Sequence, residues 1–290
     1  MCVQVVYLDW AKSQKKKITD KYIKDLEYRA ATEKGYAFNL RSGNHFLILA
    51  QDTQTNDMYI VIHSSANGHK DSSIGLYPSE NNWYKDEIRF HEDKQTGRYM
   101  RWIKGETASR FIDKAHQLEK YNALIHHWLA EELAKTLKSF IDVDGTETKH
   151  HYYMPTESSI AIGTYVERPK TIVPIFSNRD KNIVLFKISS DNYKITIRGE
   201  DHCIVPHGWG QECALDSISV QCEDNKPKTL RINGHEIPIT PDARIKDDEI
   251  GKKVRDFESF TAFQKKGAKV LHGEIVCELK PIYAYHKKDS

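Results

Sequence analysis

The chain has 290 residues, of which 39% are apolar and 29% are charged, and its formal net charge is +2. No stretch approaches the roughly 18 consecutive apolar residues of a membrane-spanning helix, and the 10% of aromatic residues argue against a disordered chain. With 43 basic and 41 acidic residues, there is no general electrostatic case for nucleic-acid binding.

The cysteines predict a reducing environment, because their number is odd and no CxxC pair occurs. The five are Cys2, Cys203, Cys213, Cys222 and Cys277. The first ten residues reach Asp9 too early for the apolar region of a signal peptide. We therefore expect a cytoplasmic protein, or one that is exported without a cleavable signal peptide.

The first hundred residues predict a few strands and one helix. The Val-rich segment 3–8 is typical of a strand. In residues 19–33 the apolar side chains recur at helical spacing, and Gly35 is the expected stop. The apolar runs 45–50 and 58–63 are separated by a polar segment, which predicts a pair of strands joined as a hairpin.

The longest periodic segment begins at Thr107 and continues to about residue 140. Its apolar residues recur at three- and four-residue spacing, which predicts one long helix with Thr107 as N-cap. A break near Tyr121-Asn122 would divide it into a helical hairpin. On this helix we expect His126 at the boundary of the apolar stripe and His127 in solvent.

The second half of the chain consists of short β-rich runs between polar turns, and Asn233-Gly234 is typical of a tight hairpin turn. The runs are residues 160–166, 171–176, 182–188, 193–198, 230–232, 236–239 and 269–279, with an ambiguous helix-like segment at 247–263. The expected fold class is α+β. An N-terminal α+β domain (1–145) with the long helix or helical hairpin precedes a mainly antiparallel β domain (146–290).

Two short motifs suggest phosphoryl chemistry. Asp142-Val143-Asp144-Gly145-Thr146 resembles the opening of haloacid dehalogenase-like phosphatases, but no alternating strand–helix units follow, so an acidic turn or calcium loop is the stronger interpretation. Glu278-Leu279-Lys280 fits half of a metal-dependent nuclease site, with Asp256 as partner carboxylate. Ordinary strand alternation explains the same Glu and Lys.

A group of thiol and imidazole side chains leaves a zinc site open as an alternative. Cys203, His207, Cys213 and Cys222 are separated by four, six and nine residues, and four such ligands suit tetrahedral zinc. The spacing matches no zinc module that we can name. We therefore predict neither a metal site nor a cofactor.

A histidine–cysteine arrangement is the most specific chemical signal. His45 heads a predicted strand directly after Ser42-Gly43-Asn44, and His63 ends the neighbouring strand. Much later, the turn Gly208-Trp209-Gly210 leads to Cys213 at a possible helix start. A helix N-terminus lowers the pKa of a thiol, and a nearby imidazole keeps the thiolate ready for attack on an acyl carbon.

This order resembles the circularly permuted NlpC/P60 and lecithin-retinol-acyltransferase-like group of papain-like cysteine hydrolases. The resemblance covers residues 40–80 and 205–220. It implies amidase, peptidase or acyl-transfer chemistry, with Cys213 as nucleophile, His45 as base and His63 as the group that orients the base. Such an enzyme would be a toxin- or effector-like hydrolase.

A second class of function stays open beside the hydrolase. A non-catalytic protein would use its β-rich half to bind another protein through aromatic loops, because aromatic side chains contribute strongly to interface energy. The candidate anchors are Trp83, Tyr84, Tyr152, Tyr153 and Trp209. The metal-dependent nuclease is a lesser alternative.

Overall fold

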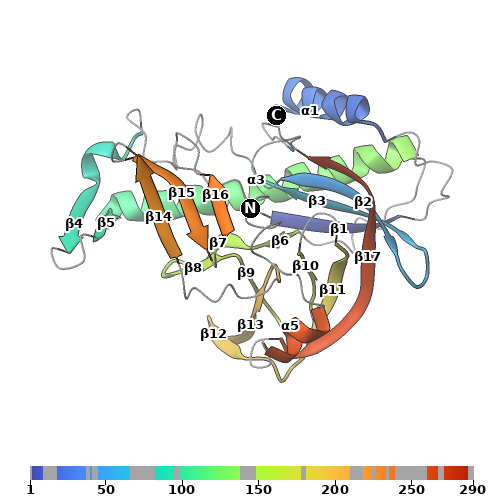
Figure 1. Ribbon diagram of the computed structural model, residues 1–290. Helices are drawn as coiled ribbons and strands as arrows, with labels where there is room; N and C mark the ends of the chain where they lie inside the picture. Colours follow the sequence, from blue (N-terminus) through green and yellow to red (C-terminus); the bar gives the residue numbers. More distant parts are fainter. Residues whose placement is uncertain are drawn as a thin grey trace.

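The computed structural model describes most of the chain, and all structural statements below concern that part. The described residues are 2–8, 18–36, 40, 45–65, 82–93, 98–137, 148–177, 181–209, 218–223, 226–232, 235–238, 260–266 and 271–286. Helices and strands are mixed throughout, so the fold is α+β (Figure 1).

A seven-stranded sheet organises the molecule, and all its neighbouring strands run antiparallel. In order across the sheet, its strands are β10 (Ile172–Ile175), β11 (Ile183–Ile188), β17 (Gly273–His286), β2 (Phe46–Asp52), β3 (Met58–Ser64), β1 (Cys2–Leu8) and β6 (Lys149–His150). Strands from before and after residue 145 therefore share one sheet, and the predicted domain boundary does not separate two sheets.

Smaller sheets surround this one. They are β12 (Lys194–Ile197) with β13 (Glu200–Pro206) and β9 (Thr164–Glu167); β14 (Ile218–Glu223) with β15 (Lys226–Ile232) and β16 (His235–Pro238); β4 (Arg89–Asp93) with β5 (Arg98–Trp102); and β7 (Tyr152–Thr156) with β8 (Ser159–Ile162). A short 3-10 turn, η3 (Lys85–Glu87), precedes β4.

Three α-helices are described. In α1 (Asp20–Lys34), the Thr19 hydroxyl caps the first turn by accepting from the Tyr22 N–H, and Gly35 ends the helix with φ 67°. The long helix α3 (Gly105–Leu137) is continuous, so the predicted break near residue 121 is wrong. The third is α5 (Phe260–Lys266). Within the described ranges, no helix is long and apolar enough to cross a membrane.

Side-chain alternation gives the seven-stranded sheet two buried faces. Leu47 and Leu49 of β2 lie in one apolar cluster with residues of α1 and α3, while Ile48 and Ala50 point into the opposite cluster. That second cluster also contains residues of β9, β13 and α5. The molecule is therefore layered, with helices on one face and small β elements plus α5 on the other (Figure 1).

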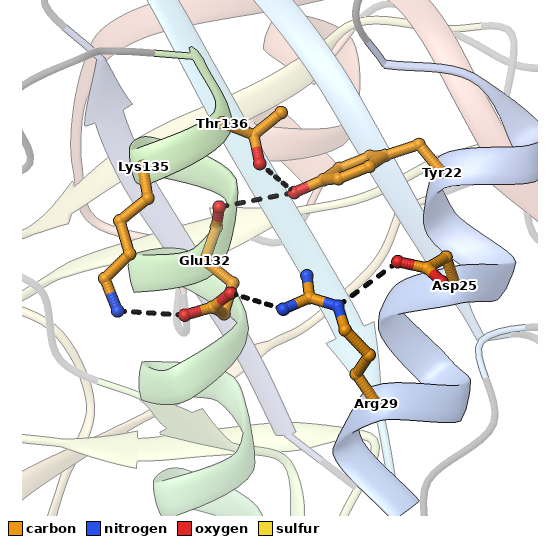
Figure 2. A network of polar contacts seen from close by, with 6 residues as sticks. All are labelled: Tyr22, Asp25, Arg29, Glu132, Lys135 and Thr136. Atoms are coloured by element: carbon orange, nitrogen blue, oxygen red, sulfur yellow. Dashed lines mark hydrogen bonds and ion pairs between the residues drawn. The ribbon is translucent and has the colours of Figure 1, made fainter. Parts of the chain in front are cut away.

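Helices α1 and α3 are joined by a polar network, shown in Figure 2 and here called the helix clasp. Arg29 of α1 donates from Nε to Asp25, 3.2 Å away, and from Nη1 to Glu132 of α3, 2.9 Å away. Lys135 donates to the other oxygen of Glu132 at 2.9 Å. The Tyr22 hydroxyl donates to the Glu132 carbonyl and also contacts Thr136. Each charge in the clasp therefore faces an opposite charge.

Several predicted elements differ from those of the structure. The run 160–166 is divided at Gly163 into β8 and β9, because the backbone there has φ 66° and interrupts the extended conformation. Strand β13 was not predicted at all. Of the helix-like segment 247–263, only 260–263 belongs to α5, and the residues before it lie outside the described part.

Candidate functional site

Histidines gather at one end of the seven-stranded sheet. Antiparallel pairing aligns Cys2 with Ser64 and with His150, and Phe46 with His63. One end of the sheet, here called the histidine-rich edge, therefore brings together the end of β3, the start of β2 and the end of β6. His45 and His151, which adjoin β2 and β6 in the chain, are carried to the same edge. His45, His63, His126 and His151 are each at most 3% exposed.

Two of these imidazoles, those of His63 and His151, form a column of parallel rings with His207, which we call the histidine stack. The ring of His151 lies 5.0 Å from that of His63 at an interplanar angle of 16°, and 4.5 Å from that of His207 at 9°. Phe46 extends the column beyond His63, at 4.8 Å and 21°. Tyr165 meets the edges of His151 and His207. Aromatic rings thus enclose the stack and limit the access of water to it.

Hydrogen bonds determine which ring nitrogens of the stack carry a proton and which keep a lone pair. The Nε2 atoms of His63 and His151 are 3.1 Å apart. Nδ1 of His207 lies 2.9 Å from the carbonyl oxygen of Gly163. Because a carbonyl oxygen only accepts, Nδ1 of His207 carries the proton and its Nε2 keeps a lone pair when the ring is neutral. The buried Nδ1 of His151 has no hydrogen-bond partner among the described residues.

Two consecutive serines hold two further imidazoles beside the stack. The Oγ of Ser64 is 2.6 Å from Nε2 of His126 on α3, and the Oγ of Ser65 is 3.1 Å from Nε2 of His45. The ring of His45 lies 6.2 Å from that of His63. Helix α3 and the sheet therefore both contribute to the histidine-rich edge.

Burial disfavours the charged form of these imidazoles. Desolvation lowers the pKa of His126 to about 3 and that of His150 to about 4. It also lowers the pKa of His151 and of His207, and the neighbouring imidazoles add to the effect at His151. These four rings are therefore neutral near pH 7 and offer lone pairs rather than positive charge.

Among the described residues, no group of three or more histidine, cysteine, aspartate or glutamate side chains is placed to hold a metal ion. The distance between Nε2 of His63 and Nε2 of His151, 3.1 Å, is nevertheless close to the distance between two ligand atoms of one metal ion. With Zn–N bonds of about 2.0–2.1 Å, two nitrogens of a tetrahedral site are roughly 3.3 Å apart.

The residues of the predicted catalytic triad are only partly described. The ring centroids of His45 and His63 are 6.2 Å apart, and the Nε2 atoms of these rings contact Ser65 and His151, respectively. Cys213 lies outside the described residues. The cysteine hydrolase therefore stays a prediction.

The Glu278-Leu279-Lys280 motif lies away from the histidine-rich edge. The Glu278 carboxylate accepts from Asn182, and the Glu278 carbonyl bonds Thr53 at the far end of β2 from His45. Asp256 and residues 142–146 lie outside the described part. Cys203 and His207 are four residues apart along extended chain, about 13 Å, which is too far for one zinc ion.

Most of the predicted aromatic anchors pack within the molecule. Tyr84 is buried against Phe111, Trp209 packs on the core residue Phe260, and Trp83 lies under the Arg110 guanidinium. Tyr153 is partly buried and donates to the Val166 carbonyl. Of the five, Tyr152 is the most exposed, at 41%. Tyr84 is thus unsuited to be an exposed anchor, because neighbouring side chains cover it.

The central members of the site were not predicted from the sequence. His151 was given no role, and His207 was named only in the zinc alternative, while His126 was expected at a boundary although it is fully buried. The signal that was available is the count of fourteen histidines in 290 residues. His127 is exposed, as predicted.

Comparison with known proteins adds no assignment to this site. Neither the models of known protein families nor the curated protein sequences match the chain.

Proposed function

We propose that the protein binds a divalent first-row transition metal ion through His63 and His151, and that this centre is its active site. The observation that carries the proposal is the 3.1 Å separation of the two Nε2 atoms in a buried, ring-lined environment. Imidazole nitrogen is a preferred ligand of zinc, copper, nickel and cobalt. This departs from the sequence prediction, which contained no metal.

The chemistry of the surrounding groups supports a metal in preference to a purely structural cluster. Apolar residues of similar size would pack at this edge without the cost of burying polar nitrogens. The buried Nδ1 of His151 is left without a partner in the described residues. A metal ion bound by Nε2 of His63 and Nε2 of His151 would offset part of the cost of burying those two nitrogens, although not the cost of the unpartnered Nδ1.

Binding requires a small rearrangement of the rings. One Nε2 of this hydrogen-bonded pair carries a proton in the metal-free chain, so its ring must change to the Nδ1–H tautomer before it binds a metal. The two rings are nearly parallel, so they must also rotate for both Nε2 lone pairs to converge on one point. His45 and His207 flank the pair and are the nearest imidazoles for a third position. An ion held by two or three protein nitrogens keeps a position for water or a substrate oxygen, which suits hydrolysis or group transfer.

Metal titration of the full-length, chelator-treated chain tests the proposal. We expect Co²⁺ to produce visible absorption bands of a nitrogen-ligated ion, and Zn²⁺ to displace it. Loss of an outer-sphere partner alone weakens metal binding 10–100-fold, so His63→Ala and His151→Ala should each weaken Co²⁺ binding by about 100-fold or more.

The exposed neighbour on α3 provides the matched control, since His127→Ala should leave the bands and the affinity unchanged. Electron paramagnetic resonance of the Cu²⁺-loaded native chain counts bound imidazole nitrogens without any variant, in case a variant does not fold. The proposal is wrong if Cu²⁺ shows no imidazole ligand, or if both folded variants keep native Co²⁺ affinity.

A further inference from the structure

Gly163, between β8 and β9, is bonded through its backbone to two members of the histidine stack. Its N–H donates to the carbonyl oxygen of His151 over 2.7 Å. Its own carbonyl oxygen accepts from the backbone N–H of His207 at 3.1 Å and from the ring Nδ1–H of His207 at 2.9 Å. One residue therefore connects the main chain of His151 to both the main chain and the side chain of His207.

The backbone conformation of Gly163 explains why a glycine stands at this position. Its φ is +66°, in the left-handed region that other residues rarely adopt. A Cβ at this site would lie 3.6 Å from Nδ1 of His207 and 3.7 Å from the Tyr152 hydroxyl, which are ordinary contacts. Substitution is therefore opposed by the backbone conformation rather than by lack of space.

The rest of the His207 segment is held independently of Gly163. The Phe176 N–H donates to the His207 carbonyl at 2.9 Å, and the Trp209 N–H donates to the Phe176 carbonyl at 2.6 Å. These bonds fasten the main chain of residues 207–209 to the end of β10. For Nδ1 of the His207 ring, the structure describes one hydrogen bond, to the carbonyl oxygen of Gly163.

We propose that Gly163 is a positioning residue, whose carbonyl holds His207 in the Nδ1–H tautomer and keeps its ring parallel to His151. Nε2 of His207 is then unprotonated and available to the histidine stack as a ligand or a base. The use of that nitrogen rests on the proposed metal centre. The tautomer itself is a property of the metal-free chain.

Long-range ¹H–¹⁵N NMR of the ring nitrogens in the full-length, metal-free protein tests the tautomer directly. In the native chain, we expect His207 to show a protonated Nδ1 and an unprotonated Nε2. In Gly163→Ala the peptide rotates away from the left-handed region, so we expect the tautomer signature to be lost and Co²⁺ binding to weaken about 10-fold.

Two further variants separate positioning from general stability. Gly199→Ala introduces the same kind of strain, since φ is +83° with open space around the missing Cβ, and should leave the His207 signature unchanged. Gly163→Asn should retain much of the signature, because Asn tolerates the left-handed conformation better than Ala does.

The outcomes are distinguishable. A native His207 with a protonated Nε2, or a Gly163→Ala chain that keeps the native signature, overturns the inference. If the tautomer changes as expected but the native chain binds no Co²⁺, then Gly163 positions His207 and it is the proposed metal centre that fails.

Discussion

The helix clasp and the histidine stack differ in the charge of their polar side chains. In the clasp, the Glu132 carboxylate lies between Arg29 and Lys135, and the hydrogen bond from Lys135 lowers the pKa of Glu132 more than any other contact. In the stack, burial alone lowers the pKa of His207. The clasp therefore keeps its groups charged and paired, whereas the stack keeps its imidazoles neutral.

The difference indicates which polar groups the fold needs for its own stability. Paired charges between α1 and α3 are explained by the docking of two helices, since each contact satisfies both partners. Buried neutral imidazoles add a desolvation cost that apolar residues would avoid. Packing alone therefore explains the stack less well than it explains the clasp, which is why the stack is the candidate site.

The largest expected effect concerns acid. Because the folded-state pKa of His126 is about 3, only the unfolded chain takes up a proton there between about pH 6.5 and pH 3. Stability is therefore full above about pH 6.5 and falls by about 1.4 kcal/mol per pH unit below it, or about 2 kcal/mol for His126 by pH 5. Chemical denaturation at pH 7 and pH 5 measures this loss.

A variant pair assigns that loss to a residue. His126→Asn also loses packing at pH 7, but its stability should differ between pH 7 and pH 5 by about 2 kcal/mol less than that of the native chain. His150 and His45 oppose the charge of His126 and remain in this variant. The exposed neighbour gives the control, His127→Asn, with native pH dependence. An unchanged pH dependence in His126→Asn would contradict the assignment.

An intermediate effect is expected in the clasp. Arg29→Met removes the cation that joins Asp25 to Glu132, and the side chains of Arg29 and Glu132 are 29% and 16% exposed. A double-mutant cycle with Glu132→Gln should give a coupling energy of about 0.5–1 kcal/mol at low salt. Since salt screens exposed charges, the coupling should shrink in about 1 M NaCl. A coupling that is insensitive to salt would contradict the surface character of the clasp.

The smallest effect is expected at the solvent-exposed end of the clasp. Lys135→Ala removes an ammonium group whose side chain is 67% exposed, and Ala favours a helix at least as well as Lys does. The denaturation midpoint should therefore match that of the native chain within error. A loss as large as that of Arg29→Met would mean that Lys135, rather than Arg29, holds Glu132 in place.

Local sequence determined several elements of this protein. Apolar periodicity predicted α1 with its Gly35 stop, the β2–β3 hairpin and the long α3, because these depend on neighbours a few residues apart. The strands of the second half were placed less well. The run around Gly163 looks continuously β-forming, and only the left-handed φ at Gly163 divides it.

Tertiary structure alone decided the sheet order and the site. Strand β17, close to the end of the chain, pairs with β2 near its beginning, and no local pattern encodes that contact. Likewise, His63, His151 and His207 are 88 and 56 residues apart in sequence, yet their rings stack. Residue type and spacing determine which segments become strands, whereas side-chain proximity depends on long-range pairing of those strands, and the candidate site arises from that pairing.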